Sequence, residues 1–395
     1  MNETQEGEEN NLRTKITNSA LIGAFIAASG AGCNTNPRNI NDIPYQTPSA
    51  LVENVNISNL ENSTTVPALK DNILTNSFDV EDIVLSSEVS EILTLTPSVE
   101  FDQEGQLFFK EDNQLKPVSI FETDRHLTYP YEKMKEVKFF VIHYDAGPAN
   151  LSTGKPRTVF NTLNGLNGIG LPSVQFCIDS YPITNKAQDD KGMGIILSQK
   201  PSELPYKGRH IGIGKNLETG EPDINRIKTA ELFVNLNIKS DLIDFVSTNN
   251  TNFDENSLGV EQVGEKFSRN FPEFFPPAQE IANILALSSA VALKYDLSVW
   301  EIVGHNEIQE KSDPGDEYMS TLRYLLGIQY LTEPNKFPED FLKGDTVEEY
   351  LTKLKDYSMS RMGEERYQKW NQIYGLDNFL YQMKTNTKED VPSIE

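Results

Sequence analysis

The sequence predicts an α/β protein with a mostly internal β-sheet, followed by a helical C-terminal extension. Short apolar runs rich in β-branched and aromatic residues are typical of buried strands. A long apolar segment of helical length lies among them, so strands and helices interleave along the chain. After Glu333 the sequence becomes strongly charged and carries apolar residues at helical spacing.

Five segments are predicted as strands because each is short, mostly apolar and bounded by turn-forming or polar residues. They are EVKFFVIHYDAGP (136–148), SVQFCID (173–179), GMGIILSQ (192–199), TAELFVNLNI (229–238) and VWEIVGH (299–305). A segment opened by prolines, PPAQEIANILALSSAVALKY (276–295), is predicted as a helix that is apolar nearly all round and hence buried. Residues 236–275 look like a long polar insertion within this domain.

The C-terminal extension, residues 334–395, is predicted to form two or three helices. Tyr350, Leu351, Leu354 and Tyr357 recur at the spacing of one helical face. The extension is expected either to pack on the core or to act as a module that binds the cell wall or a partner protein.

The N-terminal segment 1–33 has the character of a signal. Residues 16–33 carry no charge, follow Arg13 and Lys15, and end in small residues and Cys33. The apolar centre is too short to span a bilayer. This pattern resembles a bacterial lipoprotein signal, which implies that Cys33 is lipidated and that the protein is membrane-anchored in the cell envelope. Plain secretion, to the periplasm or outside the cell, and a merely apolar N-terminal helix are the alternatives. Residues 34–115 are predicted to be a polar spacer.

The charge and the cysteine content argue against nucleic-acid binding and against a disulfide framework. The net charge is −24 and the pI is about 4.6, so the chain repels the nucleic-acid backbone and no nucleic-acid partner is expected. The two cysteines define no disulfide framework. Cys177 is expected to be a buried small hydrophobe, with a catalytic or metal-binding role as the alternative.

Two of the four histidines share one context, because His143 and His305 each end an apolar strand and open a loop. Loops at the rim of a sheet commonly carry functional sites. Asp313 follows His305 after eight residues, in a turn-forming KSDPG sequence that returns the carboxylate toward the histidine. Two imidazoles and one carboxylate suit zinc and leave one tetrahedral position open for water. Core histidines and a turn-forming aspartate are the structural alternative.

Metal-assisted hydrolysis also needs a proton acceptor and a cation for the developing oxyanion. Lys311 lies two residues before Asp313 and is predicted to supply the positive charge, unless it is a solvated surface lysine. Glu231 lies in the otherwise apolar segment TAELFVNL, where an isolated carboxylate is costly unless it faces a polar site or a metal. Glu231 is therefore the predicted base, with an edge-strand residue facing solvent as the alternative.

Five motifs occur in the order typical of a known family. They are VIHYDAGP, SVQFCIDS, GRHIGIG, TAELFVN and GHNEIQEKSDPG. Over residues 116–333 the chain resembles the type 2 N-acetylmuramoyl-L-alanine amidases, the zinc amidases that include bacterial peptidoglycan hydrolases and animal peptidoglycan recognition proteins. The resemblance implies a mixed central β-sheet flanked by helices.

Position by position, the resemblance implies a complete active site. His143, His305 and Asp313 match the zinc ligands, and Glu231 and Lys311 match the catalytic glutamate and lysine. Tyr144 and His210 match residues that line the substrate cleft, and His126 is left as a structural or surface residue. The expected reaction is zinc-dependent hydrolysis of the amide between N-acetylmuramic acid and L-alanine in peptidoglycan or its muropeptide fragments. A non-catalytic peptidoglycan-binding protein and a zinc peptidase with another substrate are the alternatives.

Overall fold

The structure is a computed structural model that describes residues 83–119, 134–145, 174–183, 194–197, 220, 222–248, 253–263 and 276–386. All of the described residues belong to one compact unit. None of the described helices combines the length and the apolar character needed to cross a membrane. The predicted signal-like segment and residues 34–82 of the predicted spacer lie outside the described residues.

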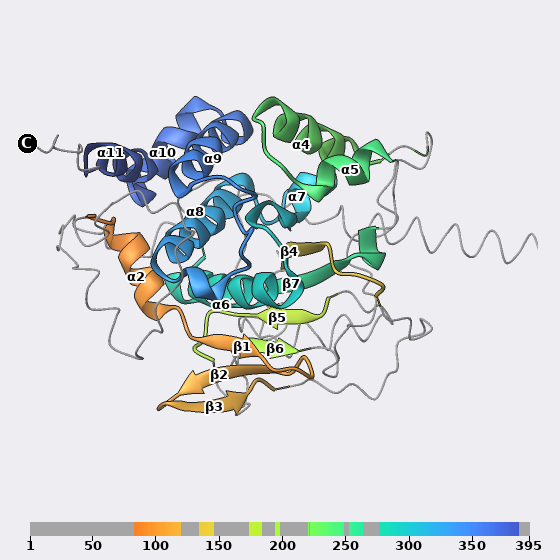
Figure 1. The fold of residues 1–395 in the computed structure, drawn as a ribbon, viewed down its shortest axis with the longest axis vertical. Coiled ribbons are helices and arrows are strands. Elements are labelled where there is room, and N and C mark those ends of the chain that lie inside the picture. Colours follow the sequence, from red (N-terminus) through yellow and green to blue (C-terminus); the bar gives the residue numbers. More distant parts are fainter. Residues whose placement is uncertain are drawn as a thin grey trace, which may run out of the picture. The chain divides into compact units, whose positions relative to one another are not determined.

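A five-stranded mixed β-sheet lies at the centre of the fold (Figure 1). The strand order is β6-β5-β7-β4-β8. The strands are β4 (Phe139–Asp145), β5 (Phe176–Ile178), β6 (Ile195–Leu197), β7 (Ser257–Val263) and β8 (Ile302–Gly304). β4, β5, β7 and β8 run parallel, and β6 pairs antiparallel with β5 at one edge. The predicted α/β class with a mixed sheet is confirmed.

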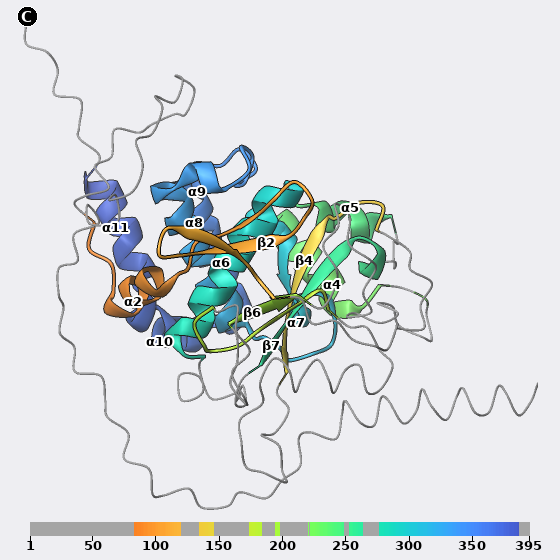
Figure 2. The same cartoon turned by 90° about the horizontal axis from the view of Figure 1, so that it is seen from below.

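Helices cover both faces of this sheet. Neighbouring side chains of β4 point to opposite faces, and Phe139 packs against Phe245 of α5 with 5.3 Å between ring centroids. On the other face, the Tyr318 hydroxyl of α8 donates a hydrogen bond to Gln262 of β7. Figure 2 shows α5 and α6 on opposite sides of β4. The helices are α4 (Ile224–Asn235) and α5 (Asp241–Ser247) on one face, and α6 (Ala278–Tyr295) and α8 (Asp316–Thr332) on the other.

Most of the predicted elements are confirmed. The predicted strands at 136–148, 173–179 and 192–199 contain β4, β5 and β6, and the predicted helix at 276–295 is α6. The last predicted strand, 299–305, is divided: Val299–Glu301 forms the 3-10 helix η5, and only Ile302–Gly304 forms β8. His305 then begins the short helix α7 (His305–Ile308).

The strand predicted over residues 229–238 is wrong, because this segment lies mostly in helix α4. Asp223 caps the helix, since its Oδ1 accepts a hydrogen bond from the Asn225 amide at 2.9 Å. The buried residues recur at helical spacing. They are Arg226, Thr229, Ala230 and Phe233. The short apolar run from which a strand was predicted covers too few residues to distinguish a strand from this longer helical period.

The polar insertion predicted over residues 236–275 is also wrong, because this stretch contains α5 and β7. β7 lies between β5 and β4 and is a central strand of the sheet. Leu258 and Val260 are fully buried, and the adjoining 3-10 helix η4 (Phe253–Glu255) stacks Phe253 on Phe139 with centroids 4.4 Å apart. The strand was missed because strands covered on both faces usually form a continuous apolar run, whereas this one contains Glu261 and Gln262 and is surrounded by polar residues.

Residues 83–115 of the predicted spacer are folded, together with the two residues that follow. They form helix α2 (Ser87–Leu95) and an antiparallel three-stranded sheet of β1 (Val99–Phe101), β2 (Leu107–Glu111) and β3 (Gln114–Pro117). The rings of Phe101 and Phe176 of β5 pack edge to face with 6.3 Å between their centroids, and Lys294 Nζ donates a hydrogen bond to the Asp102 carbonyl at 2.9 Å. This part of the spacer is therefore packed against the α/β core.

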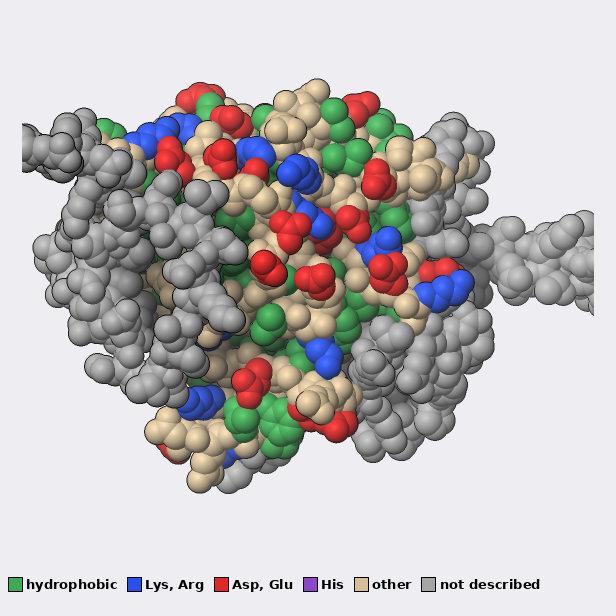
Figure 3. Space-filling view, viewed as in Figure 1, with side chains coloured by type: hydrophobic (Ala, Val, Ile, Leu, Met, Phe, Trp, Pro, Cys, Tyr) green, Lys and Arg blue, Asp and Glu red, His purple; other side chains and the backbone are tan. Residues whose placement is uncertain are grey.

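The helical C-terminal extension is confirmed. After the 3-10 helix η6 (Pro334–Lys336) it contains α9 (Val347–Met362), α10 (Glu364–Tyr374) and α11 (Leu376–Asn386). Trp370 Nε1 donates to Thr321 Oγ1 of α8 at 2.8 Å, and Tyr324 of α8 packs on Trp370 and Phe379. Figure 3 shows acidic and basic side chains interspersed over these helices, at the upper left. The extension is part of the core packing and keeps a charged outer face.

Candidate metal site

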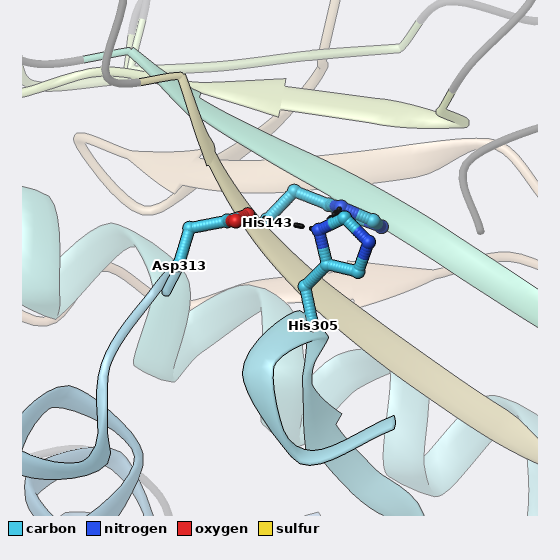
Figure 4. A group of neighbouring side chains, drawn as sticks. All are labelled: His143, His305 and Asp313. Carbon is cyan, nitrogen blue, oxygen red and sulfur yellow. Dashed lines mark hydrogen bonds and ion pairs between the residues drawn. The ribbon is translucent and has the colours of Figure 1, made fainter. Parts of the chain in front are cut away.

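The parallel pairing of β4 with β8 brings together His143, near the end of β4, and His305, the first residue after β8. Ile142 of β4 pairs with Gly304 of β8. The next residues, His143 and His305, therefore lie side by side at the same edge of the sheet. The carboxyl ends of parallel strands meet at one edge, where ligand sites commonly form. Figure 4 shows His143 on β4, His305 at the start of α7, and Asp313 on the loop that leads to α8. We call His143, His305 and Asp313 the metal cluster.

The geometry of the metal cluster fits a tetrahedral zinc ion. His143 Nδ1 lies 3.1 Å from His305 Nδ1, and His305 Nδ1 lies 3.0 Å from Asp313 Oδ2. Each residue offers one ligand atom, and the three atoms lie within 4.8 Å of one another. In a tetrahedral site with Zn–N bonds of about 2.0–2.1 Å, ligand atoms are about 3.3 Å apart. The donor set and the spacing therefore suit zinc, with both histidines more than nine-tenths buried.

Gln309 orients the His305 ring. His305 Nε2 lies 2.7 Å from Gln309 Oε1, so Nε2 carries the proton that is donated to this amide oxygen. When a metal replaces the proton on His305 Nδ1, the lone pair lies on the ring atom that faces His143 and Asp313. A partner on the outer ring nitrogen is the usual way of setting the tautomer of a metal-binding histidine.

The loop after α7 returns Asp313 to the histidines. The Asn306 amide donates to the Asp313 carbonyl at 2.7 Å, and the Tyr144 amide donates to Asp313 Oδ2 at 3.4 Å. Burial by itself raises the pKa of Asp313, but the hydrogen bond and charge of His305 and the Tyr144 amide outweigh burial and hold this pKa below its usual range. The Asp313 side chain is thus ionised, as a metal ligand must be.

A buried ion pair supports the start of α7. Glu307 accepts hydrogen bonds from Arg323 Nη1 and Nη2 at 2.7 and 2.9 Å and from the Gly304 amide at 2.8 Å. Burial raises the pKa of Glu307, but the charge and hydrogen bonds of Arg323 more than compensate, and the net pKa is lowered. Gly304 is required here, because a Cβ atom would lie 2.6 Å from Asn306 Oδ1 and 2.8 Å from Met319 Cγ. These contacts set the position of His305.

Glu261 is the carboxylate beside the metal cluster, and sequence reasoning missed it. It pairs in parallel register with His143 on one side and with Cys177 on the other, so the three side chains share one face of the sheet. Glu261 is partly exposed, whereas Cys177 is fully buried. The signal was present: Glu261 lies among Leu258, Val260 and Val263, which is the same pattern that led to the choice of Glu231.

Glu231 does not lie in a strand, and the structure turns it away from the metal cluster. It is exposed on α4, two residues from each of Thr229 and Phe233. Two residues correspond to about 200° around a helix, so Glu231 is on the opposite side from these buried neighbours. The buried face of α4 is the one that reaches α7, where Thr229 Oγ1 donates to the Glu307 carbonyl at 2.7 Å.

The other predicted site residues differ in their placement. Lys311 lies in the loop that carries Asp313, and its side chain is exposed. Tyr144 is buried on the opposite face of β4 from His143, where it is near Tyr318. His210, His126 and Cys33 lie outside the described residues. The structure therefore brings together the three predicted ligands, and Lys311 is in the loop that carries one of them. The Tyr144 ring lies on the other face of the sheet, away from the metal cluster.

Comparisons with known proteins give two solved structures. No family model matches the chain, and no curated protein matches it. One structure is the complex of the N-acetylmuramyl-L-alanine amidase AmiD from E. coli with the substrate anhydro-N-acetylmuramic acid-L-Ala-D-gamma-Glu-L-Lys. It is 13% identical, and the match covers 73% of this chain and 96% of that one, with a TM-score of 0.30. The second, AmpDH3 from Pseudomonas aeruginosa, is 17% identical over 67% of this chain and 98% of that one, also with a TM-score of 0.30.

Proposed function

We propose that this protein is a zinc-dependent amide hydrolase that cleaves the bond between N-acetylmuramic acid and L-alanine in peptidoglycan or its fragments. The observation that carries the proposal is the metal cluster, which combines two buried imidazoles with an ionised carboxylate. His305 Nδ1 lies 3.1 Å from His143 Nδ1 and 3.0 Å from Asp313 Oδ2. The choice of substrate rests on the order of the motifs around His143 and His305 in the sequence.

The metal cluster would hold zinc through His143 Nδ1, His305 Nδ1 and Asp313 Oδ2. When bound, zinc would act as a Lewis acid on the scissile carbonyl and would lower the pKa of a bound water toward about 7. Gln309 and the Tyr144 amide keep His305 and Asp313 in the orientation that presents their lone pairs.

We assign proton transfer to Glu261 in place of Glu231. Its position beside His143 in the register of β7 and β4 puts a carboxylate on the face of the sheet that carries the cluster. Glu261 accepts the proton of the attacking water and then delivers it to the leaving amine of L-alanine. The adjacent loop carries Lys311, whose ammonium group offsets the negative charge that develops on the carbonyl oxygen.

Digestion of purified peptidoglycan tests the proposal. The full-length protein is incubated with peptidoglycan, with and without a chelator, and the products are identified by mass spectrometry. The expected products are glycan strands without peptides and free stem peptides that begin with L-alanine, and the chelator should abolish both. Binding to the wall without products would indicate a non-catalytic binding protein, and cleavage within the stem peptide would indicate a peptidase.

A further inference from the structure

We propose that Arg361, in the C-terminal extension, is a positioning residue that holds the loop between His305 and Asp313 in its ligand-bearing shape. This inference rests on the proposed function, because it assigns to α9 a part in presenting the metal cluster. It gives the extension a role beyond core packing.

Arg361 contacts both ends of the loop. Its Nε donates to Asp316 Oδ1 at 2.9 Å, and its Nη2 donates to the Asn306 carbonyl at 3.3 Å. Asn306 directly follows the ligand His305, and Asp316 is three residues after the ligand Asp313. One guanidinium group therefore joins the two chain segments that leave the metal ligands.

A closed set of hydrogen bonds surrounds these contacts. Asn306 Nδ2 donates to the same Asp316 Oδ1 at 2.8 Å, and the Asn306 amide donates to the Asp313 carbonyl at 2.7 Å. The loop by itself thus has two bonds across its neck, and Arg361 adds two from α9. Asn225 of α4 also donates to the Asn306 and Gln309 carbonyls, at 3.2 and 2.7 Å, but it does not contact Asp316 among the described hydrogen bonds. Because Asp316 Oδ1 is shared between Asn306 and Arg361, loss of the guanidinium leaves this oxygen with Asn306 as its hydrogen-bond donor among the described residues.

Successive turns of α9 contact α7, through Tyr357 and then through Arg361. Tyr357 lies four residues before Arg361, one helical turn away, and its hydroxyl bonds to Glu307 Oε1. Tyr350, Leu354 and Tyr357 form the buried stripe of α9, and Arg361 continues that stripe at its C-terminal end. A cation is favoured in the last turn of a helix, and here it projects onto the loop.

The chain provides a closely matched control. Lys353, also on α9, bonds to both carboxylate oxygens of Asp345 at 2.8 Å and to the Asn237 carbonyl at 2.8 Å. Its side chain is 18% exposed, against 17% for Arg361. Lys353 is eight residues earlier, about 12 Å along the helix. The two cations share burial, helix and types of partner, and only Arg361 contacts the loop.

Hydrogen exchange and zinc affinity of the full-length Arg361→Gln and Lys353→Gln variants test this inference. In Arg361→Gln we expect exchange of the Asn306 amide and its neighbours up to residue 316 to quicken by about tenfold without metal. Zinc affinity, measured by competition with a chromogenic chelator, should fall by about 10–100-fold, as when outer partners of a metal site are removed. Lys353→Gln should leave both quantities at the parental value.

A second variant covers the case in which Arg361→Gln does not fold. Arg361→Lys keeps the charge but cannot reproduce the planar pair of bonds, so smaller changes in the same direction are expected. Equal effects of the Arg361 and Lys353 variants, or parental exchange and affinity in both Arg361 variants, would overturn the inference. Neither readout uses substrate, so a parent protein that leaves peptidoglycan intact would contradict the proposed function without altering this result.

Discussion

His143 and Glu261 are direct neighbours across the parallel strands β4 and β7, on the face of the sheet that carries the metal cluster. A metal ligand and a carboxylate are thereby placed side by side by backbone register alone. Because Glu261 lies on a different element from each residue of the metal cluster, the proposed ligands and the proposed proton acceptor can be changed independently.

Asp313→Ala is expected to remove both bound zinc and activity. Asp313 is the anionic ligand, and a cluster reduced to two imidazoles lacks the third protein ligand of a catalytic zinc site. Elemental analysis of the purified protein should show about one zinc per chain in the parent and little in the variant. Ser312→Ala, at the exposed neighbouring position, is the control and should retain the metal. Full zinc occupancy in Asp313→Ala would contradict the assignment of this ligand.

Glu261→Gln should retain zinc and lose turnover by about 10²-fold or more. The amide keeps the shape of the side chain but cannot accept the proton. Zinc content and kcat are measured on the same preparation. Glu231→Gln is the matched control, because Glu231 is exposed on α4 and should be dispensable. The assignment fails if the Glu231 variant, rather than the Glu261 variant, loses turnover.

Lys311→Ala should lower kcat with zinc retained, because the charge that offsets the developing oxyanion is lost while the ligands remain. The expected loss is about tenfold or more. Glu310→Gln, at the adjacent exposed position, should have little effect. Parental kcat in Lys311→Ala would show that this lysine is an ordinary solvated side chain.

Glu280→Gln should stabilise the fold at neutral pH. Glu280 is fully buried at the start of α6, and neither carboxylate oxygen has a hydrogen-bond partner among the residues that the structure describes. Burial, and then the charge of Asp179, raise its pKa well above the ordinary value of 4.5. Its contribution to stability is complete below pH 4.5 and is lost as the pH rises toward the folded-state pKa.

The free energy of unfolding, measured against pH, checks this expectation. Above pH 4.5 the parent should lose stability relative to Glu280→Gln, and the difference should grow with pH until the folded-state pKa is reached. Glu231→Gln, which changes an exposed carboxylate, should follow the parent curve. A constant difference between parent and Glu280→Gln from pH 4 to pH 8 would contradict the raised pKa.

We propose lipid anchoring at Cys33 because a charge-free stretch ends at this residue. Expressed in a bacterium, the full chain should enter the membrane fraction with a mass that corresponds to an acylated Cys33. Cys33→Ser should remain unlipidated and leave that fraction. An unmodified chain that begins at Met1 and stays in the cytosol would end this proposal and leave the amidase proposal intact.

The sequence by itself determined which residues form the metal cluster, and most of the sheet. His143 and His305 could be paired because each was predicted to end an apolar strand, and parallel strands bring their carboxyl ends to one edge. Asp313 could be added because a turn-forming sequence returns it toward His305. These inferences rely on local patterns and on one general rule of sheet topology, which hold whatever the distant parts of the chain do.

Only the tertiary structure decided which glutamate accompanies the cluster. TAELFVNL and SLGVEQV each carry one glutamate among apolar residues, so a local pattern does not separate a helix that buries one face from a strand that is covered on both. The choice depends on where the apolar side chains are buried. Those of α4 are buried on the side facing α7, whereas β7 is inserted between β5 and β4. The contacts of Arg361 with the ligand loop likewise join distant segments, which no local pattern encodes.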